Sequence, residues 1–305
     1  MQEVQAALAR IPLFQGNSLK GIGIERLAGL TNRNYKVSIG GESYVLRIAG
    51  EGTGAYIDRA AEEHHARVAA EAGVNAEVLY FDRESGNMLC RFIEGAVTMD
   101  AERFRDLGAV RRAAIAMRRL HTCAKPFLAR IDVFEKIDEY LALLRRSDAP
   151  IPEGYEEVQK KAEVVRRLLD DRPVPLAPCH NDPVAENFLD TGERMYVVDW
   201  EYSGMNDPMW DLGDVSVEAE FGDEQDDALM DAYFDGEPPA AQVGRMVLYK
   251  AMSDLIGTLW GVIQVVNENR AEDFWAYAVN RFERCRTLMG SADFGRHLKA
   301  AGAGT

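Results

Sequence analysis

The segment CHNDPVAENF, from Cys179 to Phe188, places carboxylates, amides and an imidazole within a few residues of a proline. Asn, Asp and Pro are ordinary turn formers, so a surface turn would need no further explanation. If the segment is buried, each polar group needs a partner or a function. The spacing of the polar residues decides between these alternatives.

His180, Asp182 and Asn187 have the spacing of a kinase catalytic loop, in which His-x-Asp is followed by four residues and then Asn. Such loops are followed by a short strand pair and a further Asp, and here Asp199 follows the runs FLD and MYVV. An isolated His-x-Asp pair is mostly structural. With the Asn, the hairpin and the second Asp added, the pattern predicts phosphoryl transfer.

This chemistry explains the residue types. One Asp must reach the attacking hydroxyl, while an amide and a second carboxylate suit Mg²⁺, which keeps water and phosphate in its remaining positions. Pro183 pushes Asp182 onto extended backbone because a residue before proline avoids the helical region. His180 is interpreted as a brace that bonds nearby backbone, not as the base.

Composition narrows the class of protein. The chain has 305 residues, 47% of them hydrophobic, and a formal charge of -15. This charge opposes nucleic acids and anionic membranes and favours small cations as ligands. The apolar run LIGTLWGVIQVV includes Gln264 and is far shorter than the ~20 residues that span a bilayer. The N-terminal sequence lacks the pattern of a secretory signal, and four scattered cysteines predict a cytoplasmic location. Oligomeric state is not readable, and a homo-oligomer stays open.

The periodicity predicts an α+β protein with two lobes. IGIERL, NYKVSI, YVLRI, AEVLYFD and NMLCRF predict a five-stranded antiparallel sheet, with a hairpin at Gly40-Gly41 and one helix over 59–72. From about Glu94 the pattern becomes helical. We therefore expect a bilobal, protein-kinase-like fold, with a β lobe over 1–94 and a larger, mainly helical lobe over 95–305. Further helices are expected over 104–121, 131–146, 152–170, 210–221, 238–267 and 271–289.

The segments GLTNRNYKV, CHNDPVAENF and VVDWEYSGMNDPMWDLG resemble the choline and ethanolamine kinase family, within the group that includes aminoglycoside phosphotransferases. The resemblance covers about residues 29–289. It implies ATP and Mg²⁺ as cofactors, Asp182 as the catalytic aspartate, and Asn187 and Asp199 as Mg²⁺ ligands. Asp211, in WDLG, resembles an aspartate that supports the backbone of the catalytic loop.

The resemblance also assigns the nucleotide site. Arg47 occupies the place of the protein-kinase lysine, and its planar fork suits phosphate oxygens. Glu62 is its predicted partner and Lys36 is the rival cation. Glu63 would face about 100° away from Glu62 on the helix. The remaining candidates are the side chains of the GLTNRN turn and the segment expected at the hinge: Thr31, Asn32, Asn34 and Glu94.

Choline carries no hydrogen-bond donor on its nitrogen, so aromatic faces and carboxylates must recognise it. By similarity, these residues are Glu201, Tyr202, Trp260, Trp275 and Tyr277. Aromatic residues at helical spacing also serve as ordinary core. Val184 departs from the glutamine of many eukaryotic members, which leaves the choice of amino alcohol open.

The sequence thus predicts an ATP- and Mg²⁺-dependent kinase that phosphorylates a small cationic alcohol, choline first. Ethanolamine, thiamine or an aminoglycoside is the alternative acceptor. A pseudokinase that binds without catalysis is the alternative from another class.

Overall fold

The computed structural model describes residues 2–15, 21–27, 29, 32–50, 52–55, 57–147 and 149–303. The first sheet has the order β1-β2-β3-β5-β4 with antiparallel neighbours, as predicted. Gly40 and Gly41 have φ of 61° and 85°, the left-handed backbone that a two-residue hairpin requires. The N-terminal part consists of α1 (Gln2–Arg10), β1 (Gly23–Arg26), β2 (Arg33–Ile39), β3 (Glu42–Ile48), α2 (Arg59–Glu71), β4 (Val78–Phe81) and β5 (Met88–Arg91).

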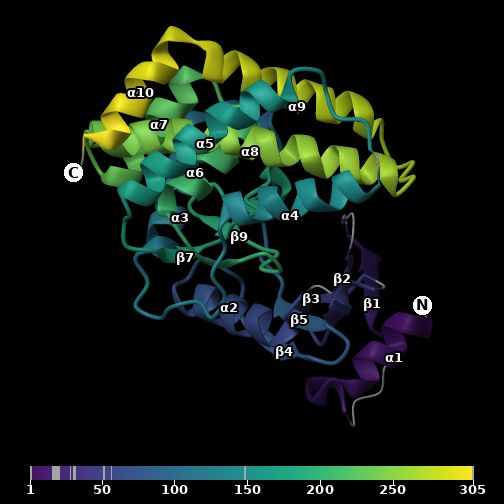
Figure 1. The fold of residues 1–305 in the computed structure, drawn as a ribbon. Helices are drawn as coiled ribbons and strands as arrows, with labels where there is room; N and C mark the ends of the chain where they lie inside the picture. Colours follow the sequence, from purple (N-terminus) through teal and green to yellow (C-terminus); the bar gives the residue numbers. More distant parts are fainter. Residues whose placement is uncertain are drawn as a thin grey trace.

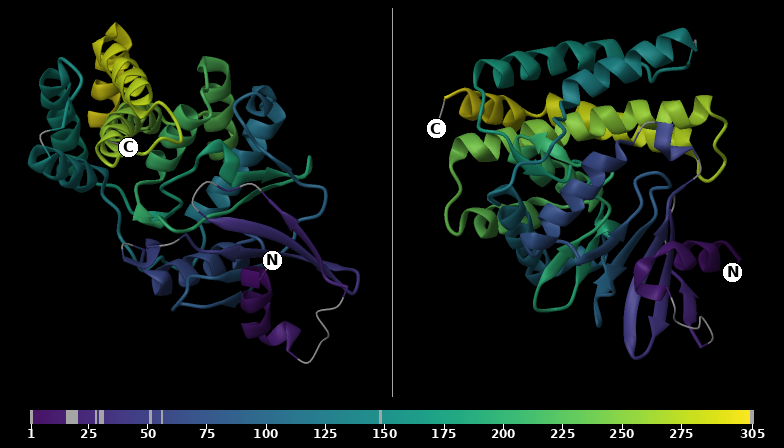
Figure 2. Two further views of the ribbon diagram at one scale, coloured as in Figure 1. Left: turned by 90° about the vertical axis from the view of Figure 1, so that its right-hand side faces the viewer. Right: turned by 90° about the horizontal axis from the view of Figure 1, so that it is seen from below.

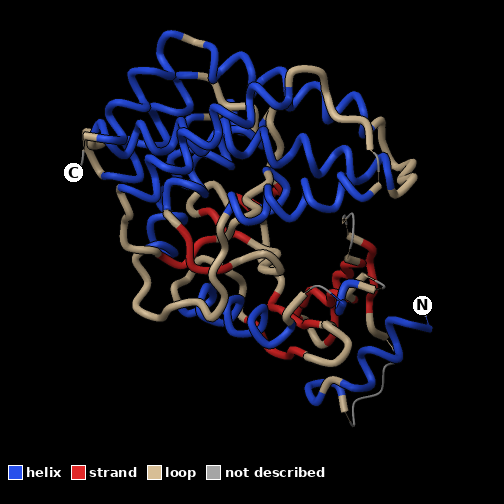
Figure 3. Tube along the Cα trace, viewed as in Figure 1, coloured by secondary structure: helices blue, strands red, loops and turns tan. Residues whose placement is uncertain are grey.

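The C-terminal part is mainly helical, as Figure 3 shows. Its helices are α3 (Leu107–His121), α4 (Val133–Arg146), α5 (Tyr155–Asp171), α6 (Pro208–Glu218), α7 (Asp223–Phe234), α8 (Ala240–Val266), α9 (Phe274–Gly290) and α10 (Ala292–Gly302). Short 3₁₀ turns occur at η1 (Pro12–Phe14), η2 (Thr53–Ala55), η3 (Arg103–Arg105) and η4 (Ala185–Asn187). Helices α7 and α10 were not predicted, because α7 is strongly acidic and α10 buries only Phe294 and Ala301.

Short strands frame the segment from Cys179 to Phe188. The predicted hairpin is confirmed as β8 (Phe188–Asp190) and β9 (Met195–Val197), and β6 (Val97–Thr98) extends it. On the other side β7 (Ala177–Cys179) pairs with β10 (Gly204–Asn206). Strands β6, β7 and β10 were not predicted, because two or three residues are too few to show a period. Strand β7 therefore leads into the predicted catalytic loop and β8 leads out of it.

Two apolar cores lie on either side of the first sheet. One joins α1 to the sheet through residues such as Leu8 and Leu46. The other begins with Ala66 and Val68 of α2 and continues through the helical part of the chain. Helix α2 therefore packs with the C-terminal core as well as with its own sheet. Figures 1 and 2 show α2 on the side of the sheet that faces the helices, whereas α1 lies on the outer side.

Helix α8 forms the centre of the helical part. Its length and composition would allow it to cross a membrane, but 78% of its apolar window is buried inside the protein, as in a core helix. Helix α6 crosses it closely at Gly213. A Cβ at this position would lie 2.8 Å from the Met246 carbonyl oxygen and 2.9 Å from the Lys250 nitrogen. The glycine thus allows α6, which carries Asp211, to approach α8.

Gly213→Ala is expected to lower the free energy of unfolding by about 1–3 kcal/mol, because the added methyl group meets backbone that cannot move aside. Gly295→Ala is the matched control. Gly295 is exposed on α10 with open space around its Cβ position. Alanine there should stabilise the helix by about 0.5–1 kcal/mol. Thermal and urea unfolding measure both variants, and a neutral or stabilising Gly213→Ala would contradict the close approach.

Candidate active site

The predicted catalytic loop, residues 180–187, is held by the buried carboxylate of Asp211. The Asp211 oxygens accept hydrogen bonds from the backbone N–H groups of His180 at 2.7 Å and Asn181 at 2.8 Å. His121 of α3 bonds the same carboxylate at 3.0 Å. Asn181 adopts φ of 66°, a left-handed conformation that Asn tolerates. The predicted support of the loop backbone by Asp211 is confirmed.

His180 is a brace, as predicted. Its Nε2–H donates to the Val198 carbonyl at 2.9 Å, and its ring packs edge-on against Trp200 with centroids 4.9 Å apart. The side chain is fully buried, and burial lowers the pKa of the ring. The imidazole is therefore neutral at neutral pH and links the catalytic loop to the segment that carries Asp199.

Asp182, Asn187 and Asp199 come together at the end of this loop. Asn187 Nδ2 donates to the Asp182 carbonyl at 3.0 Å, and the Val198 N–H donates to the Asn187 carbonyl at 2.9 Å. Asp199 has φ of 70°, which turns the chain sharply after β9. With Nδ2 engaged, the amide oxygen of Asn187 is the atom that can bind a cation.

These carboxylates carry more negative charge than their surroundings neutralise. Burial, followed by repulsion from Asp199 and Glu218, raises the pKa of Asp182 to about 7. Burial and repulsion from Glu201 raise the pKa of Asp199 to about 6, although Arg47 opposes the shift. A bound cation would relieve this repulsion.

The donor set fits Mg²⁺. The Oδ1 atom of Asp199 is buried and accepts no hydrogen bond from the residues that the structure describes, although the side chain as a whole is 39% exposed. A carboxylate oxygen and an amide oxygen are ligands that Mg²⁺ takes alongside water and phosphate. Asp199 and Asn187 are therefore the residues that would hold the ion.

The predicted pair of Arg47 and Glu62 is confirmed. The two side chains form an ion pair between β3 and α2, and both are almost fully buried. Arg47 Nη1 also lies 3.9 Å from Asp199, so the pair faces the metal site. Glu63 points elsewhere and binds Arg67 and Arg83, as expected for the next helical position. Binding of ATP phosphates by Arg47 stays a prediction.

Lys36, the rival cation, lies in the middle of β2, opposite Val45 of β3. Its Nζ is 3.7 Å from Glu94 and 3.8 Å from the centre of the Phe92 ring. It therefore belongs to the segment expected at the hinge, where Glu94 is 69% exposed. Asn34 pairs with Arg47 across β2 and β3, and Thr31 lies outside the described residues.

Arg59 is a second arginine at this site and was missed. Its Nη1 lies 2.6 Å from both Glu62 and Glu201, and its Nη2 lies 2.5 Å from the Thr53 hydroxyl. Glu201 also accepts a hydrogen bond from Asn32 at 3.1 Å. Glu201, predicted for substrate, thus contacts the N-terminal part of the chain, and its role towards substrate stays a prediction. The spacing of three residues from Arg59 to Glu62 was the available signal.

The predicted aromatic residues come from three elements: Tyr202 follows Asp199, Trp260 lies on α8, and Trp275 and Tyr277 lie on α9. Trp260 of α8 and Tyr277 of α9 meet at 5.6 Å between ring centroids and 74° between planes, and Trp260 is 40% exposed. Trp260 also meets Phe274 at 5.5 Å, and Arg281 lies 5.5 Å from the Tyr277 ring centroid, so the exposed part of Trp260 is the surface of this pair that a ligand would meet. Tyr202 and Trp275 are also exposed. Contact of these residues with a substrate stays a prediction.

Carboxylates beside the aromatic pair were also missed. Asp214 and Glu218 follow Asp211 at helical spacing on α6, so the three share one helix face. Glu218 binds Arg281 at 2.5 Å, and this guanidinium lies 5.5 Å from the Tyr277 ring centroid. Repulsion from Glu218 and Asp182 contributes to a raised pKa of Asp214, and burial is the larger cause. Acidic groups therefore extend from Asp182 towards the aromatic residues.

Comparison with known proteins agrees with this geometry. The model of the phosphotransferase enzyme family matches residues 23–243. A choline/ethanolamine kinase family protein from Mesorhizobium loti is 50% identical, with a TM-score of 0.91 and coverage of 99% of each chain. Choline kinase LicA from Streptococcus pneumoniae is 30% identical, with a TM-score of 0.76, over 94% of this chain and 98% of that one.

Further relatives extend the comparison. A LicA structure in complex with AMP is 29% identical, with a TM-score of 0.71, over 93% of this chain and 97% of that one. Protein LicA from Haemophilus influenzae is 28% identical over 272 residues, which are 88% of this chain and 80% of the relative.

Asp182→Asn is expected to stabilise the ligand-free protein at alkaline pH. The pKa of Asp182 rises from 3.8 to about 7 on folding, so the wild type loses stability as pH rises through this interval. Asn carries no charge and avoids this loss. Because the carboxyl is only half-buried, the gain is on the order of 1 kcal/mol. It should appear as a difference in Tm that grows from about pH 4 to about pH 8.

The matched control is Asp227→Asn, at an exposed position on α7. It should leave Tm unchanged at both pH values, because its carboxylate is solvated. A gain for Asp182→Asn that does not depend on pH would argue against charge repulsion as the cause.

Proposed function

We propose that this chain, which belongs to the phosphotransferase enzyme family and within it to the choline/ethanolamine kinase family, transfers the γ-phosphate of ATP to the hydroxyl of choline. The observation that carries the proposal is the position of Asp182. Its carboxylate is near enough to Asp199 and to Glu218 of α6 for both to raise its pKa, and Glu218 in turn pairs with Arg281 beside the Tyr277 ring. A hydroxyl beside Asp182 could therefore belong to a small cation.

The chain's residues would promote transfer mainly by position and charge. Asp182 accepts a hydrogen bond from the choline hydroxyl, orients its oxygen towards the phosphorus and takes its proton. The Arg47 fork, fixed by Glu62, faces the phosphate oxygens. Asn187 and Asp199 would hold Mg²⁺, which would neutralise negative charge on the phosphates. Asp211 and His180 keep the loop in place and take no proton from substrate.

The substrate end suits a methylated ammonium. Trp260 and Tyr277 offer ring faces, which attract a cation that cannot donate hydrogen bonds. Asp214 and Glu218 add acidic groups on this side, although Glu218 is paired with Arg281 and burial favours the neutral form of Asp214. Ethanolamine is the second candidate, because an unmethylated ammonium could donate hydrogen bonds directly to these carboxylates. A cytoplasmic location stays a prediction from the sequence, and whether the protein forms a homo-oligomer stays open.

A screen of ATP consumption tests the function. The protein is assayed with Mg²⁺ and with choline, ethanolamine, thiamine, an aminoglycoside or no acceptor. We expect the highest kcat/KM with choline, and phosphocholine as the product identified by mass spectrometry. If another acceptor gives a higher kcat/KM than choline, that acceptor replaces choline as the proposed substrate. If none of the acceptors causes ATP consumption, the result favours a binding protein.

Asp182→Asn should lower kcat with the preferred acceptor by at least ~100-fold, because the hydroxyl loses its base. Binding of ATP, followed by calorimetry, should change little, since Asp182 lies on the acceptor side of the phosphates. Turnover close to that of the wild type would rule out the assigned role.

Trp260→Ala should raise KM for choline about tenfold, the effect of losing a cation–π contact of about 1–2 kcal/mol. KM for ATP should stay the same, because Trp260 lies away from the Arg47 and Glu62 pair. Trp260→Phe keeps a ring face and should recover most of the affinity. If the alanine variant raises both KM values equally, Trp260 acts through the fold and not through the substrate.

A further inference from the structure

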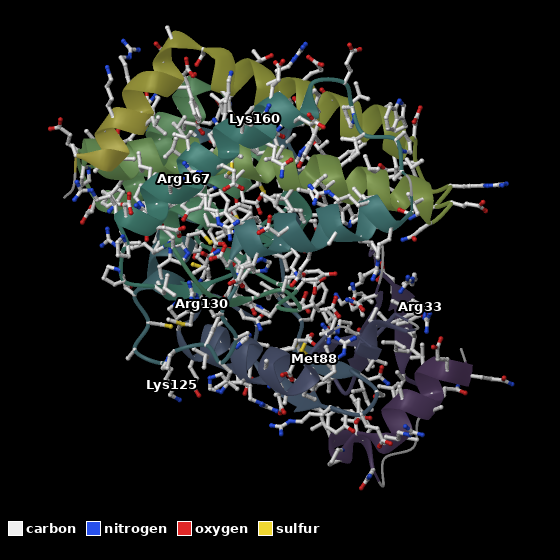
Figure 4. The ribbon with its side chains drawn as sticks, in the orientation of Figure 1. Arg33, Met88, Lys125, Arg130, Lys160 and Arg167 are labelled. Atoms are coloured by element: carbon white, nitrogen blue, oxygen red, sulfur yellow. The ribbon has the colours of Figure 1, made fainter. Side chains whose placement is uncertain are left out.

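The connection between α3 and α4, residues 122–132, runs along helix α2. Lys125 forms an ion pair with Glu71, and His64 Nε2 bonds the Pro126 carbonyl at 3.0 Å. His65 Nε2 accepts a hydrogen bond from the Leu128 N–H at 2.8 Å. Figure 4 shows Lys125 and Arg130 of this connection beside α2. The helix is therefore attached to the C-terminal part of the chain along its length.

His65 makes a second contact, with the segment that follows Asp199. Because Leu128 N–H can only donate, Nε2 must be the unprotonated nitrogen, and Nδ1–H donates to the Ser203 hydroxyl at 3.0 Å. The hydroxyl in turn donates to the Trp200 carbonyl at 2.7 Å. One imidazole thus joins three segments: α2, the connection from α3, and residues 200–203.

The ring of His65 also starts a column of aromatic side chains. It stacks on Phe127 at 4.3 Å with 24° between planes. Phe127 meets Trp200 edge-on at 6.1 Å, and Trp200 meets His180 at 4.9 Å. The column runs from α2 to the catalytic loop and is buried throughout. A movement of α2 would have to separate these contacts.

The charge state of His65 suits both hydrogen bonds. Burial is the main cause that lowers the pKa of the ring, to about 4. The imidazole is therefore neutral at neutral pH and can accept from Leu128 while it donates to Ser203. A cationic ring would turn a second N–H towards the Leu128 donor.

His65 lies on the same face of α2 as the charged residues of the active site. Arg59, Glu62 and His65 are three residues apart, which places them in a row on one side of the helix. Arg59 binds Glu201, and Glu62 fixes Arg47 beside Asp199. The row therefore touches the segment that follows Asp199 at two points, through Glu201 and through Ser203.

We propose that His65 is a positioning residue for phosphoryl transfer: held between Leu128 and Ser203, it fixes α2 so that the Glu62 and Arg47 pair faces Asp199. The kinetic part of this proposal rests on the proposed function, whereas the effect on α2 does not. His65 touches no reacting atom and acts through Glu62.

Hydrogen exchange and kinetics on the full chain test the proposal with four variants. His65→Ala removes both hydrogen bonds, His65→Asn keeps a donor near the position of Nδ1, and Ser203→Ala removes only the contact with residues 200–203. His64→Ala is the matched control, because the neighbouring histidine also binds the connection but is not on the Arg59–Glu62–His65 row. Exchange is read with no ligand and with Mg²⁺ and ADP.

We expect His65→Ala to raise amide exchange in residues 59–71 and to leave exchange in α8 and α9 unchanged. It should lower kcat at saturating ATP tenfold to a hundredfold, the effect of misplacing a positioning group by about 1 Å. His65→Asn should recover part of the protection of residues 59–71 and part of the kcat. His64→Ala should stay within about twofold of the wild-type kcat, since small surface changes have small effects.

Other outcomes overturn the proposal. If His65→Ala lowers Tm but leaves kcat and the exchange of α2 as in the wild type, His65 is only structural. His65 is also only structural if His64→Ala changes kcat and the exchange of α2 as much as His65→Ala does. If His65→Ala does not fold, Ser203→Ala takes its place in the same exchange and kcat measurements, and wild-type values for both would reject the positioning role. If the wild type phosphorylates none of the acceptors but His65→Ala still lowers the protection of α2, the proposed function fails and only the effect of His65 on α2 stands.

Discussion

The buried carboxylate of Asp211 is the interaction on which the active site depends. It accepts two backbone hydrogen bonds from the catalytic loop and a third hydrogen bond from His121 of α3. A buried carboxylate without such donors would be strongly unfavourable, so the loop and the helices stabilise one another. Gly213 lets α6 approach α8, and this contact keeps Asp211 buried beneath the loop. The loop is therefore positioned by the centre of the helical core.

Charge is distributed unequally around this loop. Towards the sheet, Arg47 and Arg59 meet Glu62, Asp199 and Glu201, so positive and negative groups alternate. Towards α6, carboxylates repel one another. Repulsion from Asp182 contributes to the raised pKa of Asp214, and repulsion from Glu218 contributes to the raised pKa of both Asp182 and Asp214. Such repulsion lowers the stability of the protein without ligands and is relieved by cations. The energetic cost in the free protein would thus become a source of affinity for the proposed metal ion and cationic substrate.

The two parts of the chain share contacts well beyond the segment that connects them. Helix α2 belongs by sequence to the sheet, but its apolar side chains enter the same core as α3 and α8. Hydrogen bonds from Val197 to Val74 and from His65 to Ser203 cross between the two parts. Helix α2 therefore couples the position of Arg47 to that of the helical part, because Glu62 on α2 is the ion-pair partner of Arg47.

The sequence by itself determined what depends on neighbours along the chain. Residue types and spacing identified His180, Asp182, Asn187 and Asp199, and periodicity identified the sheet and most helices, because these signals are local. It missed Arg59, Asp214 and the role of His65, whose partners lie far away in sequence and appear only once α2, α6 and the 122–132 connection are packed together. Only the tertiary structure decided that Glu201 faces Arg59 and Asn32, since burial selects among the partners that a carboxylate could reach.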